Sequence, residues 1–81
     1  YRAAPQCNIS VRVRDKNAAF SGGITEFAEG ARTRFGCMRV NVRPSGTEPV
    51  VRIMAEGEDR ENCERCAAEI ARYLRHIQGV I

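Results

Sequence analysis

The chain has 81 residues, of which 43% are hydrophobic and 28% are charged, and this is enough for one small domain with a single core. Its net charge of +3 falls well short of the basic stretches that bind nucleic acids or anionic membranes, so we expect neither as a partner. No apolar run has the length of a membrane span and no signal peptide is recognisable, which favours a cytoplasmic protein. Because the first residue is Tyr1 rather than Met, we expect residues 1–81 to be a single domain excised from a larger protein.

The first predicted element is a strand at residues 8–14. Polar and apolar residues alternate there without a fault, which is the period of a half-buried strand. Ile9, Val11 and Val13 should therefore face the core. Residues 1–6 before the strand contain Pro5 and are expected to be an irregular lead-in, and residues 15–17 after it are predicted to be a turn.

A helix of about a dozen residues is predicted next. Ser21 is a plausible N-cap, and Gly36 is a typical residue to end the helix. The apolar residues between them recur at helical spacing and form one stripe, made of Ile24, Phe27, Ala28, Ala31 and Phe35. We expect this stripe to cover one face of a sheet.

Two more strands are predicted on either side of a short loop, at residues 38–43 and 50–56. The core face should hold Met38, Val40 and Val42 from the first strand and Val51, Ile53 and Ala55 from the second. If the two strands form an antiparallel hairpin, Arg43 and Arg52 project from the opposite face near the loop. Both would then raise the positive potential there, although Arg52 could equally be a solvated strand residue paired with Glu48 or Glu56.

The last predicted element is a long amphipathic helix that follows Asp59 and ends at Gly79. Cys63 and Cys66 have a spacing seen in zinc and redox sites, but both fall on the apolar stripe, so we predict that they are packed as reduced thiols in the core. His76, near the helix end, is predicted to be a surface residue rather than a general base. We therefore predict no catalytic residue and no metal site in this chain.

The loop at residues 43–49, Arg-Pro-Ser-Gly-Thr-Glu-Pro, has the composition of an anion-binding loop. Gly46 permits a positive φ and close approach of a ligand to the backbone, and consecutive N–H groups around it could form a concave nest. Ser45 and Thr47 offer hydroxyl donors, and Arg43 offers a planar guanidinium that suits phosphate. The same residues are also common in plain turns, so this chemistry alone leaves both interpretations open.

The order β-α-β-β-α predicts an α+β two-layer domain with a mostly antiparallel sheet and two helices on one face. The pattern does not determine the strand order. The stretch from Val42 to Met54, with Arg43-Pro44-Ser45-Gly46-Thr47-Glu48-Pro49 at its centre, closely resembles the signature of the C-terminal domain (domain 4) of the α-D-phosphohexomutases. Within that superfamily it most resembles the phosphoglucosamine mutase family. The resemblance implies a fold like that of the TATA-box-binding protein.

The resemblance also implies a role for individual residues. In this superfamily the C-terminal loop holds the phosphate that is not transferred, and its phosphate contacts match Arg43, Ser45, Gly46 and Thr47, with Arg52 as a further candidate. Glu48 matches the motif, but since a carboxylate repels phosphate we expect it to shape the loop or to pair with an arginine. Phosphate binding remote from the reacting atoms would position the sugar for transfer.

Other parts implied by the resemblance have no counterpart in these residues. The phosphoserine loop, the Mg²⁺ loop and the sugar-recognition loop of the superfamily belong to upstream domains. We therefore expect an isomerase that transfers a phosphoryl group within its substrate when the full-length chain is present, and no mutase activity from these 81 residues alone. The expected partners are a phosphosugar and the upstream domains, and the expected reaction interconverts glucosamine 6-phosphate and glucosamine 1-phosphate.

Two alternatives remain at this point. A phosphomannomutase or phosphoglucomutase of the same superfamily would have the same domain with another sugar as substrate. A stand-alone α+β module that binds RNA or a small ligand is more distant, because RNA-binding sheets of this shape present aromatic residues and the three predicted strands contain no Phe or Tyr.

Overall fold

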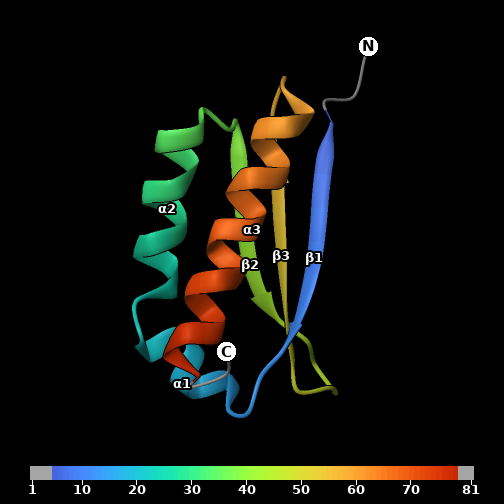
Figure 1. Ribbon diagram of the computed structural model, residues 1–81. Coiled ribbons are helices and arrows are strands. Elements are labelled where there is room, and N and C mark those ends of the chain that lie inside the picture. Colours follow the sequence, from blue (N-terminus) through green and yellow to red (C-terminus); the bar gives the residue numbers. More distant parts are fainter. Residues whose placement is uncertain (1–4, 79–81) are drawn as a thin grey trace.

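Two helices lie across one face of a three-stranded sheet in the computed structural model, which describes residues 5–78 except for the side chain of Ser21 (Figure 1). None of the helices within residues 5–78 lies over the opposite face of the sheet (Figure 1). This arrangement confirms the predicted α+β class with helices on one side. The elements in chain order are β1 (Gln6–Arg12), α1 (Lys16–Ser21), α2 (Ile24–Phe35), β2 (Arg39–Pro44), β3 (Val50–Glu56) and α3 (Arg60–Ile77).

The strand order is β1-β3-β2, with β3 in the centre and antiparallel to both neighbours. The register places Ile53 of β3 opposite Ile9 of β1 and Val42 of β2. One residue earlier, Arg52 lies opposite Ser10 and Arg43. Because directly opposed residues share a face of the sheet, the predicted division into an apolar core face and a polar face is confirmed for these residues.

The core lies between the sheet and the helices. Val51, Ile53 and Ala55 are at most 1% exposed, and α3 covers them with the side on which Cys63, Ile70 and Leu74 lie. Asp59 caps α3, since its carboxylate accepts hydrogen bonds from the backbone N–H groups of Glu61 (2.9 Å) and Asn62 (3.3 Å). None of the helices within residues 5–78 combines the length and the apolar character needed to span a bilayer.

The turn predicted at residues 15–17 is wrong, because the short helix α1 begins at Lys16. Asp15 is its N-cap and accepts a hydrogen bond from the backbone N–H of Asn17 at 2.9 Å. Ser21 is consequently the last residue of α1 and not the cap of the next helix. The residue before α2 is Gly23, whose φ of 83° is easily reached only by glycine and which forms no side-chain capping bond.

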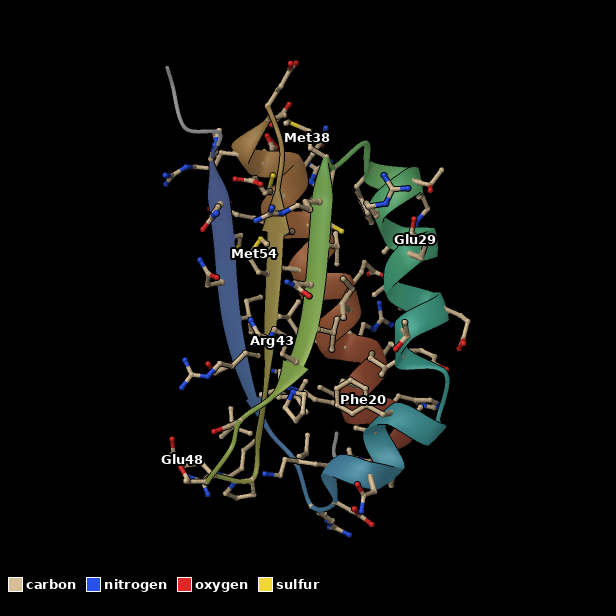
Figure 2. All side chains as sticks on the ribbon, turned by 180° about the vertical axis from the view of Figure 1, so that it is seen from behind. Phe20, Glu29, Met38, Arg43, Glu48 and Met54 are labelled. Carbon is tan, nitrogen blue, oxygen red and sulfur yellow. The ribbon has the colours of Figure 1, made fainter. Side chains whose placement is uncertain are left out.

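The position of Met38 also differs from the prediction, which placed it on the core face of the sheet. It precedes β2 at one end of the sheet and is 59% exposed (Figure 2). Cys37 occupies the buried position instead, beside Gly57 and Cys63, because the chain turns at Gly36 (φ 69°) and enters the sheet one residue later than predicted. The predicted helix end at Gly79 lies outside the described residues, and α3 is described as far as Ile77.

Burial of the cysteines on α3 is confirmed. Cys63 and Cys66 are at most 1% exposed, and all four cysteines are free thiols. Burial, reinforced by the neighbouring Cys37 thiol, raises the pKa of Cys66 to about 12, and burial also raises the pKa of Cys63. These thiols therefore stay protonated at neutral pH, which suits packing better than nucleophilic or redox chemistry.

Candidate anion-binding site

The loop between β2 and β3 lies at the end of the sheet, with Glu48 near its tip (Figure 2). Three backbone hydrogen bonds of 2.8 Å hold it in place. The N–H of Ser45 donates to the carbonyl of Val50, the N–H of Val50 donates to that of Glu48, and the N–H of Val13 donates to that of Pro49. The loop is thus attached both to its own hairpin and to the chain that follows β1.

Ser45 and Glu48 shape this loop from inside. The hydroxyl of Ser45 accepts a long hydrogen bond of 3.4 Å from the backbone N–H of Glu48. The carboxylate of Glu48 is exposed and forms no ion pair with any residue between 5 and 78. The geometry therefore favours the loop-shaping interpretation of Glu48 over pairing with an arginine.

The middle of the loop has unused hydrogen-bond donors. Among the described residues, the backbone N–H groups of Gly46 and Thr47 have no hydrogen-bond partner, and both residues are exposed. Gly46 does not adopt the positive φ that glycine permits, since only Gly23 and Gly36 have positive φ within residues 5–78. A Cβ added at Gly46 would meet no atom within 4 Å. The fold itself therefore does not require glycine here, and the open space beside Gly46 would let a ligand approach the backbone closely.

Arg43 and Arg52 are directly opposed on β2 and β3 and therefore share one face of the sheet. Arg43 lies on the face that none of the described helices covers (Figure 2). Both are exposed, and neither forms an ion pair with another described residue. Glu56, considered from sequence as a partner of Arg52, lies instead 3.5 Å from Arg39. Like charges directly opposite on neighbouring strands destabilise a sheet, and a bound anion would relieve this repulsion.

A shallow depression of about 350 Å³ lies on the same face of the sheet. Polar side chains from all three strands contribute to its lining, including Asn8, Ser10, Asn41, Arg43 and Arg52. The arginine pair is thus part of a hollow surface. Arg14 follows the end of β1 and does not line the depression.

Lys16 was not recognised as a site residue from the sequence. Its Nζ donates a hydrogen bond of 2.7 Å to the backbone carbonyl of Ser45, across 29 positions of the chain. Nothing local in the sequence indicates this contact, although Lys16 is the only lysine among thirteen basic residues. The structure therefore adds a third cationic side chain to the surroundings of the loop.

His76 is exposed in the last turn of α3, where it lines a shallow groove with Phe27 and Tyr73. Between residues 5 and 78, no three or more Cys, His, Asp or Glu side chains are arranged to hold a metal ion. The resemblance implies a Mg²⁺ loop in upstream domains, so no step that involves a metal is attributed to residues 5–78.

Residues 8–73 match the family model described as phosphoglucomutase/phosphomannomutase, C-terminal domain. The matched range includes all three strands apart from two residues of β1, the whole loop and most of α3. The chain belongs to this family.

Curated phosphoglucosamine mutases are among the relatives of this phosphoglucomutase/phosphomannomutase C-terminal domain. The enzyme of Moorella thermoacetica is 46% identical over 70 residues, which cover 84% of this chain and 16% of the enzyme. That of Thermus thermophilus is 47% identical over 75 residues, covering 90% and 17% respectively. The chain thus corresponds to about a sixth of the length of these relatives.

Solved structures support the fold of this phosphoglucomutase/phosphomannomutase C-terminal domain. N-acetylphosphoglucosamine mutase of Aspergillus fumigatus, in complex with GlcNAc-6P and magnesium, superposes with a TM-score of 0.81 at 24% identity. The superposition covers 96% of this chain and 16% of the fungal chain. Since the sequence identity is low, we take this similarity as support for the fold alone.

Proposed function

We propose that this domain binds the non-transferred phosphate of a phosphosugar through the loop after β2, as the C-terminal domain of a phosphoglucosamine mutase. The observation that supports it most is that the N–H groups of Gly46 and Thr47, and the side chains of Arg43 and Arg52, have no partner among residues 5–78. Backbone N–H groups and guanidinium groups are the donors that proteins use most for phosphate. The family membership makes a phosphosugar the natural ligand.

Each predicted contact has a definite chemical role in this proposal. Arg43 donates two parallel hydrogen bonds to the phosphate, Gly46 and Thr47 donate their N–H groups, and the Thr47 hydroxyl adds another donor. Ser45 contributes its hydroxyl, which accepts one long hydrogen bond from the described residues and keeps its own proton to donate. Arg52 supplies a second positive charge next to Arg43.

The proposed reaction of the whole protein is the interconversion of glucosamine 6-phosphate and glucosamine 1-phosphate in the cytoplasm. The names of the curated relatives support this choice of sugar. In the proposal, the nucleophile and Mg²⁺ belong to parts of the enzyme outside these 81 residues, so this chain alone does not turn over substrate. Its contribution is to hold one end of the sugar while the other end reacts.

A phosphomannomutase or phosphoglucomutase is the second candidate, because the matching family model includes both activities by name. A comparison of glucosamine, glucose and mannose 6-phosphates as substrates of the full-length enzyme would separate the two proposals. RNA binding is disfavoured, since β1, β2 and β3 contain no aromatic residue on which bases could stack.

The phosphate grip is testable by amide NMR titration of this chain with glucosamine 6-phosphate. A single loop that holds one phosphate should bind weakly, with a dissociation constant on the order of 1 mM. We expect saturable shifts confined to residues 45–47 and their neighbours, and none with unphosphorylated glucosamine. A folded sample without localised shifts would contradict phosphate binding by this domain.

Gly46→Ala is expected to separate binding from folding. The new Cβ meets no protein atom, and the residue does not have positive φ, so the free energy of unfolding should stay the same or rise by about 0.4–1 kcal/mol. The methyl group would nevertheless keep a phosphate from approaching the backbone, and we expect affinity in the NMR titration to fall about tenfold. The matched control is Gly30→Ala in α2, where a Cβ also meets nothing; it should leave affinity unchanged. Equal affinities for both variants would show that the ligand does not contact the backbone at Gly46.

A further inference from the structure

The contact between Lys16 and Ser45 acts on a single peptide unit. Lys16 lies on α1, and its Nζ donates a hydrogen bond of 2.7 Å to the carbonyl oxygen of Ser45. That carbonyl and the N–H of Gly46 belong to the same peptide bond, which is planar and trans, so they point in opposite directions. Whatever fixes the carbonyl of Ser45 therefore also fixes the direction of the Gly46 N–H.

Lys16 is the only described residue that tethers this peptide unit. The N–H of Gly46 has no partner among the residues described, and the carbonyl of Ser45 accepts from Lys16 alone. Without this tether, the peptide could rotate while the neighbouring bonds of Ser45 and Val50 stay in place. We propose that Lys16 is a positioning residue, which aims the N–H of Gly46 at the phosphate; this inference rests on the function proposed above.

The backbone that presents Lys16 is itself held firmly. Gln78, at the end of α3, is 8% exposed, and its side chain binds the turn just before Lys16. Its Oε1 accepts hydrogen bonds from the backbone N–H groups of Arg14 (2.9 Å) and Asp15 (3.1 Å). Its Nε2 donates a hydrogen bond of 3.1 Å to the backbone carbonyl of Asp15. The residues that these bonds connect are 63 or 64 positions apart in the chain.

The support for Lys16 thus extends from α3 through the start of α1 to the loop. Lys16 is half-buried, so its flexible side chain is already restricted before the ligand binds. A hydrogen bond from a charged donor is stronger than one between neutral groups, particularly when it is shielded from water. The loop can accordingly be organised in the absence of ligand, which lowers the entropy cost of binding.

The test compares Lys16→Met with the wild type and with two matched variants. Lys16→Arg keeps a cationic donor, and Arg60→Met removes one positive charge at the start of α3, at the end of the fold opposite the loop (Figure 1). Each variant is titrated with inorganic phosphate and with glucosamine 6-phosphate, and the dynamics of the Gly46 and Thr47 amides are measured by ¹⁵N relaxation without any anion. Lys16→Gln serves as a second neutral variant in case the methionine alters folding.

We expect Lys16→Met to increase the mobility of the Gly46 amide before ligand is added and to weaken binding about tenfold, the size expected for a charge-assisted hydrogen bond. Lys16→Arg should stay within about threefold of the wild type, and Arg60→Met should not differ from it. Unchanged affinity in Lys16→Met would overturn the inference. Weaker binding with unchanged ligand-free dynamics would also overturn it, because Lys16 would then be a direct contact. If the wild type itself shows no binding at the loop, the proposed function fails together with the inference.

Discussion

Arg43→Ala is expected to weaken the binding of glucosamine 6-phosphate by about tenfold or more, because hydrogen bonds to charged groups contribute about 1.5–3 kcal/mol each. The side chain is exposed and has no ion-pair partner among the described residues. Its removal should therefore not destabilise the fold, and loss of the repulsion with Arg52 could make the sheet slightly more stable. The NMR titration and a urea denaturation curve measure the two effects separately.

Three further variants show whether the effect is specific to Arg43. Arg43→Lys keeps the charge but loses the planar fork, so its affinity should lie between those of the wild type and Arg43→Ala. Arg60→Ala removes a positive charge at the other end of the molecule and should leave affinity unchanged. If Arg52→Ala weakens binding and Arg43→Ala does not, then Arg52 is the main contact and the assignment of roles within the pair is wrong.

Ile53→Ala is expected to lower the free energy of unfolding by about 2–5 kcal/mol. Ile53 is 1% exposed on the central strand, opposite Ile9 and Val42, so the smaller side chain would leave a cavity between the sheet and the helices. A chain of this size has few kilocalories of stability to lose, and a large share of the variant should be unfolded at room temperature. Urea denaturation, monitored by circular dichroism, measures the difference in the free energy of unfolding between the variant and the wild type.

Met54→Ala is the matched control on the same strand. Met54 is the next residue in the sequence but lines the depression on the open face. We therefore expect Met54→Ala to lower the free energy of unfolding by less than about 1 kcal/mol. Ile53→Val, which removes one methyl group, should cost about 0.5–1.5 kcal/mol. Similar losses for Ile53→Ala and Met54→Ala would contradict the division of the sheet into a core face and an open face.

The pattern of apolar and polar residues along the chain predicted most of the fold, because the main sequence signals for its elements are local. Alternation with period two marks residues such as Val51, Ile53 and Ala55 as core positions whatever the neighbouring strand is. Gly36 ends α2 in the left-handed conformation that only glycine adopts easily. The short helix α1 was missed because six residues are too few for a periodic pattern, although Asp15 had the chemistry of an N-cap.

The candidate site was only partly predictable, because the sequence signals that mark it are also local. The motif from Arg43 to Thr47 is contiguous, so its donors could be named from the sequence, and whether they bind phosphate stays a prediction. The opposition of Arg43 and Arg52 followed from assuming a hairpin, which the register confirms. Gly46 permits a positive φ but does not adopt one, because the composition of a loop limits its backbone conformation without determining it.

The sequence by itself determined the elements apart from α1, the side of each strand that faces the core, and the residue types available in the loop. The tertiary structure alone decided that β3 is the central strand, that Lys16 reaches the carbonyl of Ser45, and that Gln78 holds the turn before Lys16. These contacts join residues far apart in the chain, and their formation depends on how the helices and the sheet pack together. Local patterns report which face a residue prefers, but they contain no information about which distant backbone group will lie opposite it.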